Sequence, residues 1–381
     1  MPCLNDLKKG YRPYPLCDSH VHIAFPMEIG DTERFIDRYM TYFGLERVAL
    51  LALPHSSRAS SDDPCNNLKA LCLKRRLNAL WPEKRVYAFG GLYHHFDRQD
   101  TPEGFVSQAA ALKAAGFDGL KVLLGKPALR RRLGVGLDDP LLEGVWRFCE
   151  RERFPVTLHL GDPASFWLKG ADGAPPVYNG DFPTLEQLRA ETERVLSRHP
   201  GLDITLCHFY FMAEEPLFAD RLMEEHPSVS LDLTPGSEMY YGFTLRHDFW
   251  RDFFLRHQTR ILFGTDSDNW DSPAALEKCE RSFSYPFNLV RSALEGAAPF
   301  RFEDHDYGPL EPLALPGEAL MNIYHDNLAR RLGEPKPVDG DALRLRMKEL
   351  LGAYKDGLIR DGGEARRALE QANLETMLST L

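Results

Sequence analysis

Short apolar runs recur along the chain and alternate with longer amphipathic segments. Most of these runs are apolar at consecutive positions, which is typical of strands that are buried on both faces of a parallel sheet. We therefore expect eight strands, at residues 15–23, 48–54, 86–95, 119–125, 155–161, 203–211, 229–235 and 260–268.

The segments between these strands place apolar residues three and four positions apart, as amphipathic helices do. Clear examples lie at 31–44, 101–116, 139–152, 184–200 and 218–227. Several begin at a residue that can cap a helix, namely Asp31, Thr101, Asp139 or Thr184. Strands that are each followed by a helix predict an α/β fold of the (β/α)₈ TIM-barrel type. An open doubly wound sheet is disfavoured because no glycine-rich phosphate turn follows the first strand.

Three segments depart from this regular alternation. Residues 162–183 and 269–316 form long loops after the fifth and eighth expected strands, and loops of this length usually cover or line a functional site. Extra C-terminal helices are expected at 341–358 and 364–381, appended to the surface of the barrel. We expect a single domain over residues 1–381, with a barrel core at 15–333 and the appended helices within 334–381.

Composition narrows the class of protein and its partners. The 381 residues are 43% hydrophobic, so a large core can form, and the formal net charge of −10 disfavours nucleic acid and anionic membranes as partners. A small-molecule substrate is expected, and a homo-oligomer is left open. The seven cysteines include no C-x-x-C pair, and the N-terminus has no signal-like apolar stretch. These features predict a reduced, cytoplasmic protein without a membrane span.

Candidate chemistry gathers at the ends of the expected strands, where TIM barrels hold their active sites. His20 and His22 are two positions apart on the first strand, so their side chains share one side. His159, His208 and Asp266 end the fifth, sixth and eighth strands. Three imidazoles and a carboxylate suit Zn²⁺ or a neighbouring divalent ion, with one position left for water.

Three further residues lie beside these histidines in the sequence. Asp18 has the parity of His20 and His22, and could orient an imidazole or serve as a hydrogen-bonding group at the strand entry. Cys17 and Cys207 are expected to point away from the neighbouring histidines and to act as small buried hydrophobic residues.

The strand-end segments, in this order, resemble the amidohydrolase superfamily. They are DSHVHI (18–23), DGLKVLLGKP (118–127), VTLHLGDP (156–163), ITLCHF (204–209) and ILFGTDSD (261–268). The similarity is greatest to the amidohydrolase-related branch, which includes aminocarboxymuconate semialdehyde decarboxylase-like enzymes. The segment MNIYHDNLARRLG (321–333) resembles the final barrel helix of that branch. The resemblance spans residues 15–333 and leaves the two long loops outside it.

The resemblance implies one divalent metal, with zinc as the expected ion, bound by His20, His22, His159 and Asp266. It also implies that His208 acts on the substrate or on water activated by the metal. Asp266 would both contact the metal and hold the proton of that water. The catalytic residues expected on this basis are His208 and Asp266.

Lys121 leaves the number of ions open. Its segment resembles the one in which binuclear members carry a carboxylated lysine between two metals, and His159 and His208 would then bind the second ion. We favour one ion because the branch that the chain resembles is mostly mononuclear. In that case Lys121 is a pocket residue.

Further residues are expected to contact the substrate around the barrel mouth. They are Lys121, His94, His95 and Trp167, of which only one of the two adjacent histidines can face inward. Trp167 could form an aromatic wall or simply pack within a lid. The cluster Arg130–Arg132 could bind a carboxylate, but a solvated charge run is favoured. His55 is a weaker candidate.

Three functions are compatible with these residues. The first is a metal-dependent hydrolase acting on a C–N or C–O bond of a small polar substrate through metal-activated water. The second is a metal-dependent non-oxidative decarboxylase of a small carboxylic acid, which would use the same ligands. The third is a catalytically silent barrel that binds only a ligand or metal, and the intact set of strand-end residues disfavours it.

Overall fold

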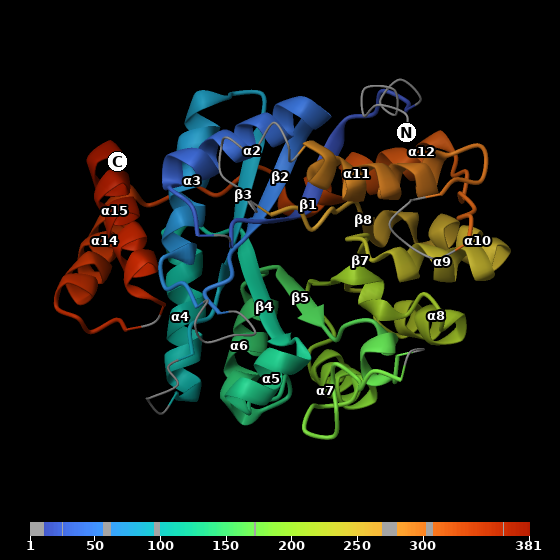
Figure 1. The fold of residues 1–381 in the computed structure, drawn as a ribbon, viewed down its shortest axis with the longest axis horizontal. Helices are drawn as coiled ribbons and strands as arrows, with labels where there is room; N and C mark the ends of the chain where they lie inside the picture. The colour runs from blue at the N-terminus through green and yellow to red at the C-terminus, as the bar shows by residue number, and fades with distance from the viewer. Residues whose placement is uncertain are drawn as a thin grey trace.

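The computed structural model describes residues 11–24, 26–55, 62–94, 100–170, 173–268, 280–301, 308–360 and 362–381. Within these ranges the strands form one eight-stranded parallel sheet in the order β1 to β8 (Figure 1). Every expected strand is present. The strands are β1 Leu16–His22, β2 Leu45–Leu51, β3 Arg85–Gly91, β4 Gly119–Gly125, β5 Val156–Leu160, β6 Ile204–Leu206, β7 Val229–Asp232 and β8 Ile261–Leu262.

The two edges of this sheet meet. Ser19 N donates to Phe263 O at 3.0 Å, and His22 N donates to Ser267 O at 2.7 Å. Asp266 N donates back to His20 O at 3.0 Å. The segment that follows β8 is therefore bonded to β1, and the sheet forms a nearly closed barrel. The predicted (β/α)₈ fold is confirmed.

Helices follow the strands and surround the barrel (Figure 1). They begin close to where the sequence predicts, and the caps explain several of the starts. Thr101, Asp139 and Thr184 each accept a backbone N–H in the first turn of the next helix, as expected. The prediction that Asp31 caps a helix is wrong, because the helix already begins at Ile29. The helices around the barrel are α2 Ile29–Phe43, α3 Asn66–Leu80, α4 Pro102–Ala115, α5 Pro127–Leu133, α6 Pro140–Arg151, α7 Leu185–Arg198, α8 Pro216–Glu225, α9 Ser237–Leu245, α10 His247–His257, α11 Glu280–Glu295, α12 Gly317–Met321 and α13 Asn327–Leu332.

Short helical turns complete the barrel, and two C-terminal helices follow it. The turns are η2 Ala164–Trp167, η3 His208–Phe211, η4 Gln258–Arg260 and the π-type turn η5 Asn322–Asp326. The last joins α12 to α13 within the segment that resembles the final barrel helix. The extra C-terminal helices are confirmed as α14 Gly340–Lys355 and α15 Glu364–Thr380.

The two long connections differ from expectation. Residues 162–183 contain only the short turn η2 within their described part. The long connection expected at 269–316 contains the helix α11, so its described part is not a loop throughout. The apolar residues of this stretch form a helix whose Phe287 and Leu294 are buried in the core.

Buried apolar residues fill the space between the strands and the surrounding helices in one large cluster. A smaller cluster joins side chains of β1, β2, β3 and β8 to Leu328 and Leu332 of α13. Cys17 belongs to this smaller cluster and is 1% exposed, as expected for a small buried hydrophobic residue. Among the described residues, no helix combines the length and the apolar character that crossing a membrane requires.

Candidate metal centre

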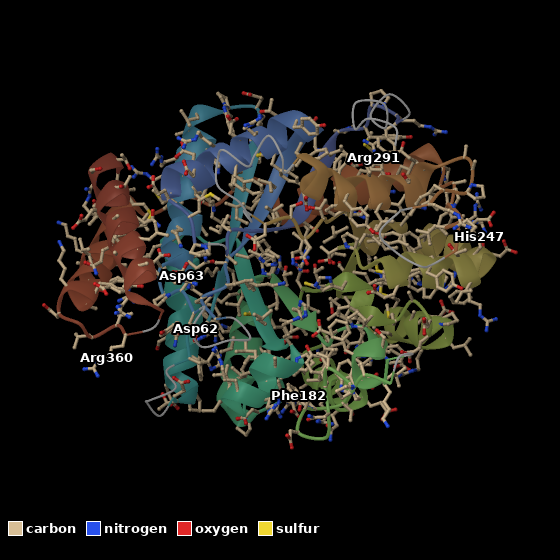
Figure 2. All side chains as sticks on the ribbon, in the orientation of Figure 1. Asp62, Asp63, Phe182, His247, Arg291 and Arg360 are labelled. Carbon is tan, nitrogen blue, oxygen red and sulfur yellow. The ribbon has the colours of Figure 1, made fainter. Side chains whose placement is uncertain are left out.

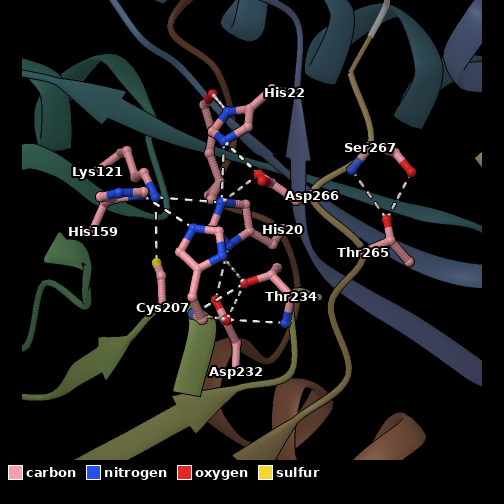
Figure 3. Close-up of polar contacts among 12 residues, drawn as sticks. His20, His22, Lys121, His159, Cys207, Asp232, Thr234, Thr265, Asp266 and Ser267 are labelled. Atoms are coloured by element: carbon pink, nitrogen blue, oxygen red, sulfur yellow. Dashed lines mark hydrogen bonds and ion pairs between the residues drawn. The ribbon is translucent and has the colours of Figure 1, made fainter. Parts of the chain in front are cut away.

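The alternating histidines of β1 meet the aspartate that follows β8 (Figure 3). His20 Nε2 lies 3.1 Å from His22 Nε2 and 3.3 Å from an Asp266 carboxylate oxygen. The same oxygen lies 3.2 Å from His22 Nε2. The structure therefore brings together three of the four predicted metal ligands.

The outer nitrogens of both imidazoles are held by acceptors. His20 Nδ1 lies 2.8 Å from the Asp232 carboxylate, and His22 Nδ1 lies 2.9 Å from the carbonyl oxygen of Leu51. A carbonyl or carboxylate oxygen can only accept, so each Nδ1 carries the proton. Each Nε2 is then left with a free electron pair, which is the form of histidine that binds metals.

With both imidazoles neutral, three electron-rich atoms face one another with no proton among them. Such an arrangement is repulsive unless a cation lies between the atoms. Ligands bound at about 2.0–2.1 Å in a tetrahedral zinc site are roughly 3.3 Å apart, which matches the distances of 3.1 to 3.3 Å found here. The donor set formed by His20, His22 and Asp266 therefore fits a divalent ion.

His208 reaches this group from an unusual backbone conformation. The chain turns directly after β6, and His208, Phe209, Tyr210 and Phe211 all have φ between 49° and 56°. Left-handed conformations cost about 1–2 kcal/mol per residue for L-amino acids, and such strain often accompanies functional sites. The His208 N–H donates to the Asp232 carboxylate at 2.8 Å, which holds the start of the turn. Nitrogen atoms of His20 and His208 and an Asp266 oxygen lie within 4.8 Å of one another.

The ring of His208 is oriented by a second chain of hydrogen bonds. The Thr234 hydroxyl donates to Asp232 at 2.5 Å and so accepts from His208 Nδ1 at 3.1 Å. This leaves the electron pair of His208 on Nε2, 3.0 Å from His159 Nδ1. His159 Nε2 lies 3.0 Å from the Gly161 carbonyl and must donate to it, so the His159 Nδ1 is also unprotonated. A proton or a cation is needed between the two rings.

His159 thus contacts the other ligands through His208, with its free nitrogen directed at that residue. Its assignment as a metal ligand stays a prediction. Lys121 of β4 lies beside His20 and Cys207, as expected for a pocket residue, and is 2% exposed. Its ammonium nitrogen is 3.4 Å from His20 Nε2 and 3.3 Å from Cys207 Sγ.

The contact with Lys121 corrects the expected direction of Cys207. We expected Cys207 to point away from the site because it adjoins His208 on a strand. β6 instead ends at Leu206, and the chain then enters the left-handed turn. The alternation of side chains in a strand therefore does not apply to Cys207 and His208. Cys207 contacts Lys121, and His208 lies beside His20 and Asp266.

The protonation states suit a metal. Burial and the Lys121 charge lower the pKa of His20 to about 3, although Asp232 opposes the shift. Burial also lowers the pKa of His159 and His208. Burial alone would raise the pKa of Asp266, but the surrounding histidines outweigh it and hold the pKa well below its usual value. Neutral imidazoles and an ionised carboxylate are the forms that bind a divalent ion.

The residues predicted to contact the substrate do not all lie at one place in the structure. Lys121, His94 and His55 line one small cavity. His94 N donates to His55 Nε2 at 2.7 Å, which joins the two histidines. His95 lies outside the described residues. Trp167 donates to Pro183 O at 3.1 Å and packs on Tyr178 within the connection after β5, which matches the alternative of a lid-packing residue.

The basic residues after β4 have ion-pair partners, as a structural role predicts. Arg130 pairs with Glu191, and Arg132 pairs with Asp62, whereas Arg131 forms a longer contact with Asp181 at 3.7 Å.

Asp18 does not orient an imidazole ring. Its carboxylate accepts from the Tyr39 hydroxyl at 2.5 Å, from the Thr265 hydroxyl at 2.7 Å and from the His20 backbone N–H at 3.0 Å. The bonds from Tyr39 and Thr265 tie β1 to α2 and to the segment after β8. The strand-entry interpretation of Asp18 is the one that the contacts support.

Asp232 and Thr234 are the main residues that the sequence reasoning missed. Asp232 ends β7, contacts His20 and His208, and is fully buried. Burial would raise its pKa, but the two histidines and the Thr234 hydroxyl lower it overall. A carboxylate in the middle of an expected buried strand, in the segment SLDLTP, is the signal that could have revealed it.

We expect Asp232→Asn to weaken zinc binding by about 10–100-fold, which is the usual effect of losing the partner of a metal-binding histidine. The amide keeps the shape but removes the charge that supports the Nδ1 proton of His20. Competition with a chromophoric chelator measures the dissociation constant. Asp248→Asn is the matched control, because the Asp248 side chain is fully exposed on α10. Unchanged zinc affinity in Asp232→Asn would refute the orienting role.

Comparisons with known proteins agree with this architecture. The model of a family described as Amidohydrolase matches residues 17–333. No curated protein matches the sequence. An uncharacterised TIM-barrel protein of Bordetella bronchiseptica is 15% identical, with 83% of this chain and 98% of that chain covered and a TM-score of 0.50. IDCase of Metarhizium anisopliae, in its apo form, is 17% identical, with 84% and 97% covered and a TM-score of 0.50. These likenesses concern the fold.

Proposed function

Because the chain belongs to the amidohydrolase family, we propose that it is a metal-dependent hydrolase that cleaves a C–N or C–O bond of a small polar molecule. The observation that carries the proposal is the group of three unprotonated ligand atoms contributed by His20, His22 and Asp266 at mutual distances of 3.1 to 3.3 Å. A divalent ion, with zinc expected, would supply Lewis acidity there, which acidifies water and polarises a substrate oxygen.

Asp266 and His208 would carry out the proton transfers. The Asp266 side chain is 37% exposed and is ionised, so its carboxylate can accept a proton from water at the barrel mouth. His208 Nε2 carries an electron pair, and a ring nitrogen of His208 lies within 4.8 Å of an Asp266 oxygen, so His208 can take up this proton from Asp266 and give it to the leaving nitrogen or oxygen. The Nδ1 proton of His208 is fixed by Thr234 and Asp232, so the exchangeable proton is confined to Nε2.

A decarboxylase of a small carboxylic acid remains the alternative from the same family, because it would use the same ligand set. A single experiment separates the alternatives. The zinc-loaded protein is incubated in ¹⁸O-labelled water with a panel of small amides, lactones and aromatic acids, and products are followed by mass spectrometry together with CO₂ release. Label in the product supports the hydrolase. Release of CO₂ with no label in the organic product identifies the decarboxylase. Metal binding without any product from the panel would favour a barrel that only binds.

The number of ions is tested at Lys121. We propose one ion per chain, and two if Lys121 is carboxylated. The contact between His159 Nδ1 and His208 Nε2 at 3.0 Å is the observation that favours a second ion. For one ion, we expect Lys121→Met to leave the zinc content at about one per chain, since two-metal sites need a bridging group.

Elemental analysis in bicarbonate buffer measures the zinc content, and Lys126→Met is the matched control. Lys126 is the next lysine along the same segment and pairs with Asp162 rather than with His20. Two ions in the native protein, falling to one only in Lys121→Met, would establish the carboxylated form.

A further inference from the structure

The C-terminal helices α14 and α15 lie outside the residues that match the family, which end at 333. They pack against the side of the barrel formed by α2 and α3 (Figure 1). Both were expected to be surface additions. Their contacts instead lead to the ends of β1 and β2, next to the candidate metal centre.

Asn373 of α15 holds the segment that follows β1. Its side-chain oxygen accepts from Ile29 N at 2.8 Å, and its amide nitrogen donates to Met27 O at 3.1 Å. Asn373 is 2% exposed, so both bonds are shielded from water. One side chain of α15 therefore fixes the backbone only a few residues beyond His22.

Asn66 of α3 joins the ends of the two strands. Its amide nitrogen donates to Ile23 O at 3.0 Å, directly after His22, and its oxygen accepts from Leu53 N at 2.7 Å. Leu53 is two residues beyond Leu51, whose carbonyl orients His22 Nδ1. The position of Asn66 thus affects both the backbone of His22 and the acceptor that fixes its ring.

A buried ion group connects Asn66 to α15. Asp63 accepts from the Asn66 amide at 3.2 Å, and Lys69 bridges Asp63 at 2.5 Å and Glu370 at 3.0 Å. Asp63 lies between the C-terminal helices and the barrel (Figure 2). Glu370 is 1% exposed, as is Asp63, and Lys69 is 2% exposed. Removing one member of such a group leaves a buried charge uncompensated, so its geometry is strongly constrained.

This group could be mistaken for a second metal site. Oxygen atoms of Asp63 and Glu370 and the sulfur of Cys65 lie within 4.8 Å of one another. The Lys69 ammonium already supplies the positive charge there, with contacts to both carboxylates. The group is therefore a structural connection between α3 and α15.

We propose that α15 positions the metal centre through two residues. Asn373 acts directly on the segment after β1, and Glu370 acts through Lys69, Asp63 and Asn66 on the ends of β1 and β2. The proposal rests on the proposed function, because it concerns the site where His22 would bind the ion. Its consequence is that a segment outside the family match contributes to metal affinity. The effect arises from the placement of His22 and its acceptor, since α15 supplies no ligand to the centre.

The test compares zinc affinity with local stability. Asn373→Leu keeps a similar volume but removes both bonds to the segment after β1. Asn373→Asp keeps the acceptor for Ile29 N and removes the amide donor to Met27 O, which also contacts Glu370 at 3.5 Å. This variant serves if the leucine variant does not fold. Glu375→Ala is the matched control, because it breaks an exposed ion pair with Lys355 between the same two helices.

We expect Asn373→Leu to weaken zinc binding by about 10-fold, the lower end of the effect of supporting residues at metal sites, and Asn373→Asp to weaken it in the same direction. Amide hydrogen exchange should also become faster at 21–24 and 51–53, whether or not zinc is present. The control should change neither quantity. Unchanged zinc affinity, or faster exchange confined to α14 and α15, would overturn the proposal. If the native protein binds no zinc, the proposed function fails, and the exchange of the metal-free protein still decides whether α15 positions these strand ends.

Discussion

Replacing His22 with alanine should reduce the zinc content from about one ion per chain to nearly none, and turnover should be lost with it. Apparent binding free energies of four-ligand zinc sites are roughly 10–16 kcal/mol, so one ligand in four contributes about 3 kcal/mol, or a factor of more than ~100 in the dissociation constant. The same loss is expected for His20→Ala and Asp266→Ala, because the three side chains share the centre.

Elemental analysis after gel filtration measures the zinc content, and a chelator titration gives the affinity. His247→Ala is the control, since His247 lies on α10 at the far side of the molecule (Figure 2). Full zinc occupancy in His22→Ala would show that the ligand assignment is wrong. The same measurement on His159→Ala decides whether His159 binds the ion or only contacts His208.

Replacing His208 with asparagine should keep the metal and lower turnover by about 10²–10⁴-fold, which is the usual contribution of a general acid–base group. His208 Nε2 is the one nitrogen of this ring whose proton is free to exchange, because Nδ1 is bonded to Thr234. Asparagine can still contact Thr234 but cannot transfer a proton near neutral pH. The pH profile of kcat should therefore lose one limb.

Zinc content and kcat are measured on the same preparation, so that loss of metal and loss of chemistry are told apart. His226→Asn, on the C-terminal side of α8, is the control. A large fall in zinc content in His208→Asn would make His208 a ligand and support a second ion shared with His159. Unchanged kcat would remove His208 from the mechanism.

Much of the fold could be predicted because it depends on local patterns. Consecutive apolar residues marked each strand, and the capping residues Thr101, Asp139 and Thr184 marked helix starts. Strand ends were less predictable. β6 is only Ile204–Leu206, because the chain then enters a turn of non-glycine residues with positive φ, which the sequence does not indicate. β8 is only Ile261–Leu262, although the residues that follow it still bond to β1.

The ligands of the candidate site could be predicted from the sequence, but the groups that orient these ligands could not. His20 and His22 were found from their two-residue spacing, and Asp266 from its place at a strand end. Asp232 and the Leu51 carbonyl fix which nitrogen of each ring is free, yet Asp232 is 212 positions from His20 and a backbone carbonyl has no sequence signature. The direction of Cys207 was missed for a related reason, since a turn after β6 replaced the alternation of a strand.

The sequence by itself determined the eight strands, the order of the helices and the residues able to bind a metal, because these depend on side-chain type and on spacing within one element. Only the tertiary structure decided the tautomers of His20 and His22, the pairing of His159 with His208 and the connection of α15 to the segments that follow β1 and β2. These features arise from hydrogen bonds between residues far apart in the chain. The strength of such bonds depends on burial and on distances of a few ångströms, which no local pattern encodes.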